Sequence, residues 1–323
     1  MLRRLLIGCG VLSLIVMMAP AVMAQENHHP NEVIYDATVA PLIVPTGSDF
    51  APDPGEEKSA DKAGINTYID ITENIQAGVL TPFYRFSPKF AMKAHVPIIW
   101  NMTRSFGGSD INASGLGDIT FDGEYTHPLA TPGTRLRFAA SVKLANGDDE
   151  NTVEDDSGFP VDMPLGTGTT DYVLRGQYAK STPKKGLLFG LMYRKPSPTE
   201  TVSVVGSVTQ TTKDTASNQI VASAFGRKRI NPSWWAHMGL SIMMLGDGEK
   251  ITQYSDGTPD FDWGANRAGT LIDIFPGVSY ALGKFNPFLG LRLPLSTSFD
   301  NTRGTDRNVA FIFQFSYRPD SMN

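Results

Sequence analysis

RLRFAASVKL, which spans residues 135–144, decides the fold of this chain. Apolar side chains occupy its even positions, whereas the odd positions are mostly polar or basic. A period of two places these two sets on opposite faces of a β-strand. The first set is Leu136, Phe138, Ala140, Val142 and Leu144; the second is Arg135, Arg137, Ala139, Ser141 and Lys143. We therefore expect a strand with one apolar face and one largely charged face.

The same alternation recurs at residues 89–100, 118–125 and 311–318. A soluble β-sandwich would alternate in this way too, with its apolar face in a core. Two features favour a transmembrane β-barrel instead. The polar faces carry long charged residues of both signs, and aromatic residues cluster beside the short turns. The predicted fold class is therefore an all-β, antiparallel transmembrane barrel.

Short turns alternate with long polar stretches along the chain, as they do in outer-membrane barrels, where the short turns are periplasmic. The short turns are expected at 87–88, 128–133, 182–186, 231–233 and 283–284, and the long loops at 104–114, 147–169, 196–218, 246–268 and 298–306. The aromatic residues beside the short turns predict an interfacial girdle. They are Phe86, Phe90, Tyr125, Tyr178, Trp234, Trp235, Tyr280, Phe285 and Tyr317.

Twelve strands are expected after residue 64, with no boundary that divides them into two domains. Their ranges are 64–73, 76–86, 89–103, 115–127, 134–147, 168–180, 185–196, 217–230, 233–246, 268–280, 284–297 and 306–318. An even number places both termini on the short-turn side. Residues 201–212 are also compatible with a further β-ribbon above the membrane.

The first 24 residues are typical of a secretory signal peptide, because Arg3 and Arg4 precede a short apolar core and an A-x-A-like cleavage site ends at Ala24. An uncleaved anchor helix and a lipoprotein signal ending at Cys9 are the less favoured alternatives. Signal removal leaves 28 − 2 = 26 basic and 33 acidic residues, a net charge of −7, and no cysteine. This balance argues against a nucleic-acid partner.

Residues 25–63 are rich in proline and acidic side chains and are expected to form a mostly irregular periplasmic or plug segment ahead of the barrel, which spans 64–323. The apolar stretch 41–45 within this segment is the part expected to enter the barrel as a plug.

Three short motifs carry a resemblance to a known family. They are GLGDI at 115–119, LGTGTTDY at 165–172, and FPGVSY at 275–280 followed by NPF at 286–288. Over residues 64–318 the chain resembles the outer-membrane "MetA-pathway of phenol degradation" or "transporter" proteins. The resemblance implies a barrel that passes small, often aromatic or apolar, molecules, and it supplies no catalytic residues. The last five residues, 319–323, depart from the usual terminal aromatic of barrel assembly signals.

If the apolar faces meet lipid, a set of charged residues lines the lumen. The set is Lys93, His95, Asp118, Asp122, Glu124, Arg135, Arg137, Lys143, Arg175, Asp273 and Arg292. A hairpin register opposing Glu124 to Arg137 also opposes Asp118 to Lys143. A charge ladder that orients solutes and a structural salt-bridge network are both consistent with this pattern, the network being favoured. Arg135, Arg137 and Arg175 would form a positive inner stripe.

Other candidate sites are weaker. The acidic loop 147–169 has carboxylates suited to calcium, but a solvated loop is the favoured interpretation. His28 and His29 are better explained as tail residues than as metal ligands. Ser233 and Ser241 near His237 are nominal candidates for a lipid hydrolase, although no G-x-S-x-G pattern is present.

The sequence therefore predicts a non-enzymatic channel in the outer membrane of a Gram-negative cell, for passive uptake of small, aromatic or apolar molecules, with no cofactor or metal. Its expected partners are outer-membrane lipid and lipopolysaccharide, the solute, and the barrel-assembly machinery. The alternatives are an outer-membrane lipid-modifying enzyme and a structural or adhesive barrel that acts through its loops.

Overall fold

The structure, a computed structural model, describes residues 63–72, 74–106, 109–147, 152–154, 160–163, 165–205, 208–246, 248–256, 259–262, 268–281, 285–299 and 309–317. The expected signal peptide, the plug segment and the residues after Tyr317 lie outside these ranges. Within them the structure is all-β, and no helix is long and apolar enough to cross a membrane.

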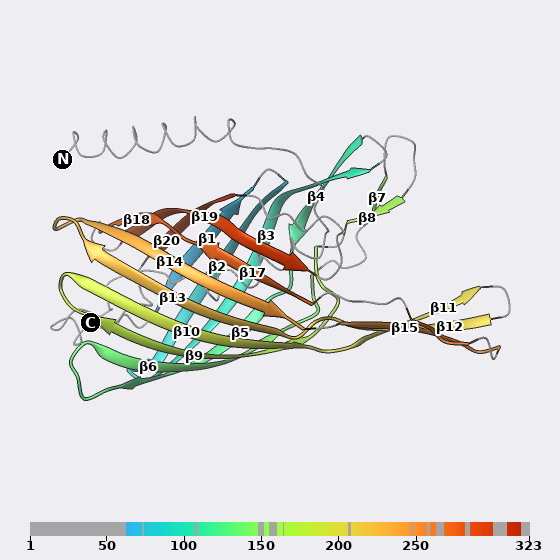
Figure 1. The fold of residues 1–323 in the computed structure, drawn as a ribbon, viewed down its shortest axis with the longest axis horizontal. Helices are drawn as coiled ribbons and strands as arrows, with labels where there is room; N and C mark the ends of the chain where they lie inside the picture. Colours follow the sequence, from blue (N-terminus) through green and yellow to red (C-terminus); the bar gives the residue numbers. More distant parts are fainter. Residues whose placement is uncertain are drawn as a thin grey trace.

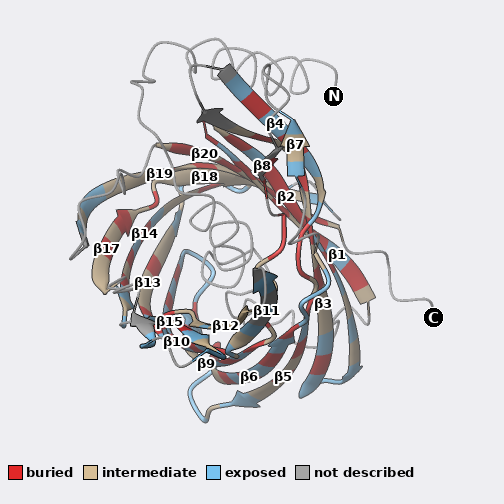
Figure 2. Ribbon diagram, turned by 90° about the vertical axis from the view of Figure 1, so that its right-hand side faces the viewer, coloured by how far each residue is buried: buried red, intermediate tan, exposed pale blue. Residues whose placement is uncertain are grey.

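The strands form a closed antiparallel barrel of twelve strands, two of which are each interrupted and carry two labels (Figures 1 and 2). The ring closes because β1 pairs with both β2 and β20, and β14 pairs with β13, β17 and β18. In ring order the strands are β1 (Ala63–Ile71), β2 (Ile75–Ser87), β3 (Phe90–Phe106), β4 (Ser109–Leu116) with β5 (Thr120–Pro128), β6 (Thr134–Lys143), β9 (Asp171–Ser181), β10 (Lys185–Pro196), β13 (Gln219–Arg229), β14 (Trp234–Leu245), β17 (Gly269–Ile274) with β18 (Gly277–Tyr280), β19 (Phe285–Phe299) and β20 (Ala310–Tyr317).

The twelve predicted strands are confirmed, with two interruptions. The fourth barrel strand is interrupted at residues 117–119, which divide it into β4 and β5. The tenth is interrupted at 275–276, which divide it into β17 and β18. Ala63 lies opposite Tyr84 and Ile65 lies opposite Tyr317, so the described ends of the chain are on the short-turn side, as expected.

The prediction of a loop at 104–114 is wrong, because β3 continues to Phe106 and returns as β4. The β-ribbon considered for 201–212 is present as β11 (Thr199–Val205) and β12 (Val208–Thr215). It pairs with β15 (Glu249–Tyr254) and β16 (Phe261–Asp262), and this small sheet projects from the long-loop end (Figure 1). The loop after β6 holds the hairpin β7 (Thr152–Glu154) and β8 (Pro160–Asp162).

The outward faces of the strands are apolar, which is the reverse of the surface of a soluble protein. On β6 the side chains of Phe138 and Val142 are exposed, whereas Arg137, Ser141 and Lys143 are buried. On β20, Ile312, Gln314 and Ser316 are buried while the intervening aromatic residues are half-buried. Apolar residues facing outward and polar residues facing the enclosed side are the pattern of a barrel that meets lipid.

Aromatic pairs on neighbouring strands surround the short-turn end. The ring centroids are 5.8 Å apart for Phe90 and Tyr125, and 4.9 Å apart for Trp234 and Tyr280. Phe285 and Tyr317 are likewise 4.9 Å apart. Trp235 is the exception to the predicted girdle: it is buried and faces inward, because it follows the outward-facing Trp234 on the same strand.

Candidate functional site: the inner wall of the barrel

All eleven predicted lumen residues are buried or half-buried. Asp118 and Lys143 belong to one cluster, which extends to β10 and β13, and a second cluster holds Lys93, His95, Asp122, Glu124, Arg137 and Arg175. Arg292 on β19 belongs to a separate pair, 3.0 Å from Asp70 on β1. The hydroxyl of Tyr68 also donates to Asp70, at 3.1 Å. Asp273 on β17 is buried.

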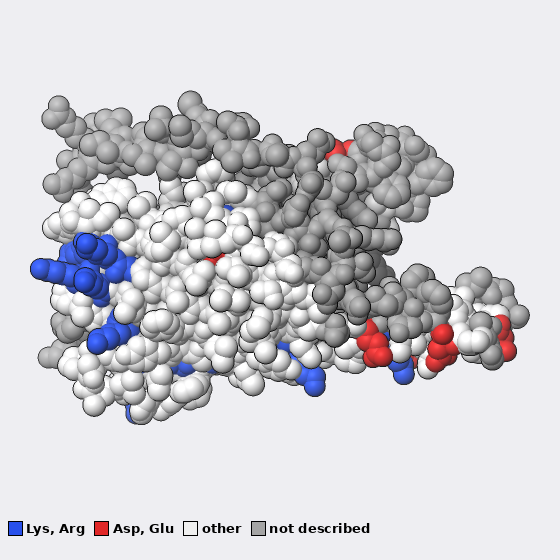
Figure 3. All heavy atoms as spheres, in the orientation of Figure 1, with Lys and Arg blue, Asp and Glu red and all other residues white. Residues whose placement is uncertain are grey.

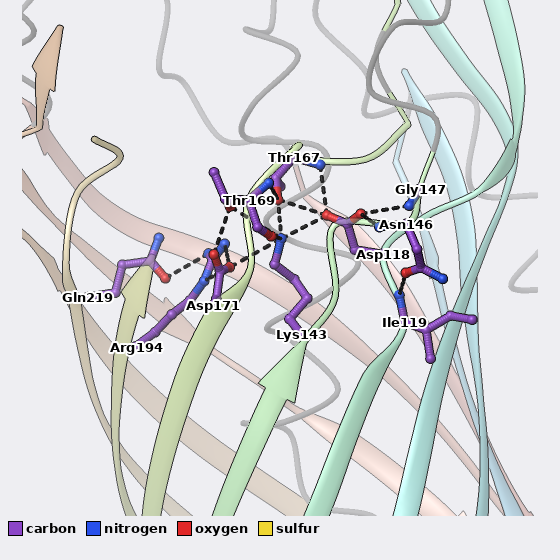
Figure 4. Close-up of polar contacts among 10 residues, drawn as sticks. All are labelled: Asp118, Ile119, Lys143, Asn146, Gly147, Thr167, Thr169, Asp171, Arg194 and Gln219. Atoms are coloured by element: carbon purple, nitrogen blue, oxygen red, sulfur yellow. Dashed lines mark hydrogen bonds and ion pairs between the residues drawn. The ribbon is translucent and has the colours of Figure 1, made fainter. Parts of the chain in front are cut away.

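Asp118 is the centre of the first cluster (Figure 4). Its Oδ2 atom lies 2.7 Å from the Lys143 ammonium and accepts hydrogen bonds from the amide of Thr167 at 2.8 Å and its hydroxyl at 2.7 Å. Its Oδ1 atom accepts from the amides of Gly147 at 2.8 Å and Asn146 at 3.2 Å. One carboxylate in the barrel wall therefore holds both ends of the long loop between β6 and β9.

A chain of alternating charges continues from Lys143 along the wall (Figure 4). The Lys143 ammonium also lies 3.3 Å from Asp171 and donates to the Thr169 carbonyl at 2.8 Å. Asp171 accepts from Arg194 Nε at 2.6 Å, and Arg194 Nη1 donates to Gln219 at 3.1 Å. Two carboxylates thus face two cations, so the cluster is charge-balanced, as buried ions must be.

A second cluster lies nearer the short turns. Glu124 is 2.7 Å from Lys93 and 3.8 Å from Arg137 Nε. Asp122 pairs with Arg175 and accepts from the Ser141 hydroxyl at 2.9 Å. His95 contacts it as well, with Nε2 3.8 Å from the Asp122 carboxylate and Nδ1 3.1 Å from Thr81 Oγ1. Arg137 and Arg175 are therefore ion-paired, so the predicted positive stripe is in large part neutralised.

The predicted hairpin register is wrong by two residues, although the predicted ion pairs form. Glu124 lies opposite Ala139, and Thr120 lies opposite Lys143. Asp118 and Lys143, like Glu124 and Arg137, therefore meet diagonally, which long side chains can do across a two-residue offset.

The β6–β9 loop is also packed by apolar contacts. Met163 and Leu165 are almost fully buried against residues of β2, β3 and β4, including Ile99 and Ile111. Glycines permit this close approach: a Cβ on Gly166 would lie 2.8 Å from the Asp118 carboxylate. The motifs around residues 115–119 and 165–172 therefore meet in space.

The remaining inner wall holds a large apolar cluster, here called the apolar wall, among buried charged residues such as Arg194, Asp273 and Arg292. Moving around the ring from β10 to β2, the buried cluster consists of Leu188, Met192, Val221, Phe225, Met243, Leu271, Phe275, Phe288, Ile312, Tyr68 and Val79, with Val173 and Ala179 on β9. These residues occupy the inward positions of their strands, alternating with outward side chains such as Leu187 and Leu191. The interior thus combines ion-paired groups with an apolar wall that is itself interrupted by buried charged and polar residues.

Gln314 lies within the apolar wall. It is 2% exposed, and both polar atoms of its side-chain amide have no hydrogen-bond partner among the groups described. The strand register places it opposite Tyr68 on one side and Phe288 on the other.

His237 does not meet either serine that the sequence suggested. Its Nε2 atom is 2.7 Å from the hydroxyl of Ser279 on β18, and its ring packs edge-on against Phe288. Ser241 lies four residues further along β14, opposite Ser223 and Asp273. The lipid-hydrolase alternative, for which Ser233 and Ser241 are nominal candidates, gains no support from the contact with Ser279. Near this point Arg227 stacks over the Trp235 ring at 4.3 Å.

Five of the seven carboxylate residues of the acidic loop, and His28 and His29, lie outside the described residues. Among those described, no group of three or more metal-ligating side chains is close enough to hold an ion. The prediction that this loop is solvated rather than calcium-bound stays untested.

Sequence reasoning missed Asp171, Arg194 and Gln219, which complete the first cluster. Asp171 is four residues before Arg175 and thus on the same strand face, so the period of two was a sufficient signal for it. Thr167 and Thr169 carried no such signal, because they lie in a loop whose path the pattern does not define.

Neither a protein-family model nor a curated protein matches this sequence. Among solved structures, the chain is similar to an outer membrane channel from Pseudomonas putida F1, with a TM-score of 0.59 and 16% identity over 82% of this chain and 99% of that one. It also matches the NanC porin, with a TM-score of 0.46 and 9% identity over 80% and 100% of the two chains. The first likeness shows a shared fold, the antiparallel β-barrel of an outer-membrane channel. The resemblance to the phenol-degradation family stays a prediction.

Proposed function

We propose that this protein is an outer-membrane channel that admits small, aromatic or apolar molecules passively. The observation that carries the proposal is the cluster of apolar and aromatic side chains at inward positions from β10 to β2, beside the ion-paired groups of the barrel wall. Selective pores for ions are built from rings of polar or charged groups, whereas an apolar lining favours solutes that lose little on leaving water.

The membrane location is supported by the outer surface. Leu174, Leu187, Phe189 and Leu191 are large apolar side chains about half exposed on β9 and β10. Such a continuous apolar surface is costly in water and is normal against lipid. The aromatic pairs at the short-turn end fit the headgroup layer.

A restricted lumen is expected from the strand number, since eight strands are filled by side chains and sixteen or more enclose a wide water channel. The β6–β9 loop, held by Asp118 and by the packing of Met163 and Leu165, would narrow the mouth further. The side-chain amide of Gln314 would hydrogen-bond to a solute that reaches it beside Tyr68 and Phe288, which suits a ring bearing a single hydroxyl.

The test is uptake by liposomes that contain the purified protein, with phenols, alkanes, sugars and ions compared at equal gradients. We expect phenols to enter faster than sugars of similar size. Phe288→Ala and Gln314→Leu should each change the phenol-to-sugar ratio, whereas Phe189→Ala, on the outward face of β10, should leave it unchanged. Uptake of sugars and phenols at equal rates would contradict the proposed solute class, and no uptake of any solute would contradict the channel.

A further inference from the structure

The short-turn end of β9, β10 and β13 carries an exposed group of four lysines, Lys180, Lys184, Lys185 and Lys228. Lys and Arg side chains gather at this end of the molecule in Figure 3, whereas Asp and Glu gather on the projections at the opposite end. Two strand registers place the group together, because Lys185 lies directly opposite Lys228 and Lys180 lies opposite Leu187.

The strands around these lysines provide no local countercharge in the part of the chain that the structure describes. No Asp or Glu occurs between Asp171 and Glu200, or between Asp214 and Asp247, which are the segments that form β10, β13, β14 and nearly all of β9. The neighbouring strand β6 has no acidic residue either. Like charges placed directly opposite each other on a sheet are destabilising, so the Lys185–Lys228 pair favours an anion from outside the chain.

The position of the lysines indicates which anion this is. Each lysine lies at the end of an outward-facing row of a strand or in the adjacent turn. On β10 the outward-facing row consists of Leu187, Phe189 and Leu191, and Lys185 is at its short-turn end. Tyr172 and Leu174 occupy the same face of β9, which ends at Lys180. A lysine at the edge of an apolar band extends its ammonium into the headgroup layer.

We propose that Lys180, Lys184, Lys185 and Lys228 bind the phosphate of an anionic phospholipid in the leaflet at the short-turn end. This inference rests on the proposed membrane location but not on the solute. Juxtamembrane basic side chains gain attraction from anionic lipid headgroups within a Debye length of the surface. An acidic soluble protein is the competing partner, and it would not require the lysines to border the apolar band.

Native mass spectrometry of the detergent-solubilised protein tests the proposal, with phosphatidylglycerol and phosphatidylcholine of identical acyl chains as probes. We expect phosphatidylglycerol to bind about fivefold more tightly or better, roughly the effect of one lysine near an anionic surface. The combined change Lys180→Gln, Lys184→Gln, Lys185→Gln and Lys228→Gln should abolish this preference. The control change Lys195→Gln with Lys213→Gln, at exposed positions of the long-loop end, should preserve it.

Heat-modifiable gel migration verifies that both variants are folded. If the four-lysine variant does not fold, the salt dependence of wild-type binding decides, because the preference should fall as ionic strength rises. Equal binding of both lipids, full competition by inorganic phosphate, or a preference retained by the four-lysine variant would overturn the proposal. Loss of the lipid preference in the four-lysine variant, with solute uptake unchanged, would confirm the proposal. Failure of the wild-type protein to take up any solute, with its lipid preference intact, would contradict only the channel function.

Discussion

At the scale of single residues, Asp118 has the most consequences. It is fully buried, and it accepts hydrogen bonds from three backbone amides and a hydroxyl while pairing with Lys143. The sequence predicted its inward direction and its pairing with Lys143, because both follow from strand periodicity. Its role in holding the β6–β9 loop was not predictable, since that role depends on Gly147 and Thr167 returning to the same point.

We expect Asp118→Asn to lower the free energy of unfolding by about 3 kcal/mol, because removing one partner of a buried ion pair leaves the other uncompensated. Urea titration in lipid measures this change. The variant should also become sensitive to protease within residues 147–170. Glu200→Gln, at an exposed position of β11, is the matched control and should change stability by less than about 0.5 kcal/mol. Equal stability of the two variants would contradict the anchoring role.

Two glycines offer a second comparison at this scale. A Cβ on Gly166 would meet backbone of Gly147 at 2.8 Å and the Asp118 carboxylate at the same distance, whereas a Cβ on Gly176 meets no atom within 4 Å. We therefore expect Gly166→Ala to lower the temperature at which the barrel unfolds, measured by heat-modifiable gel migration. Gly176→Ala should leave this temperature unchanged. A reversed order of the two variants would show that the loop does not approach Asp118 closely.

At the scale of elements, the sequence predicted the existence and order of the strands better than their pairing register and their length. Alternation and short turns predicted all twelve barrel strands, because an inward face and a lipid-facing apolar face impose a period of two on each strand. The register of β5 and β6 was off by two, since a shift of two residues keeps every side chain on its correct face. The extension of β3 and β4 beyond residue 103 was missed because polar residues there resemble a loop.

The projecting sheet of β11, β12, β15 and β16 pairs only with itself in the described part of the chain. We therefore expect that replacing residues 200–213 with a short Gly-Ser linker leaves the heat-modified migration temperature and the phenol uptake of the barrel unchanged. Circular dichroism should show a small loss of strand signal. A barrel that fails to assemble without this ribbon would show that it contributes to folding.

At the scale of the whole molecule, the ring of strands separates an apolar exterior from an interior that combines ion pairs with an apolar cluster. The sequence predicted the exterior and the charges of the interior. It did not predict the apolar wall, because Leu188, Val221 and Phe225 lie on inward positions that the charged-face pattern assigns to polar residues. These residues come together only when the ring of strands closes, and no local sequence pattern predicts which residues then meet.

The most direct test of this account is a spin-label scan of β10 in reconstituted lipid, with cysteine introduced singly at residues 186–193 of the mature chain, which is expected to lack cysteine. We expect oxygen accessibility to peak at positions 187, 189, 191 and 193 and to fall at the four intervening positions. A scan without a period of two, or with its maxima at 188 and 192, would contradict a barrel whose apolar face meets lipid.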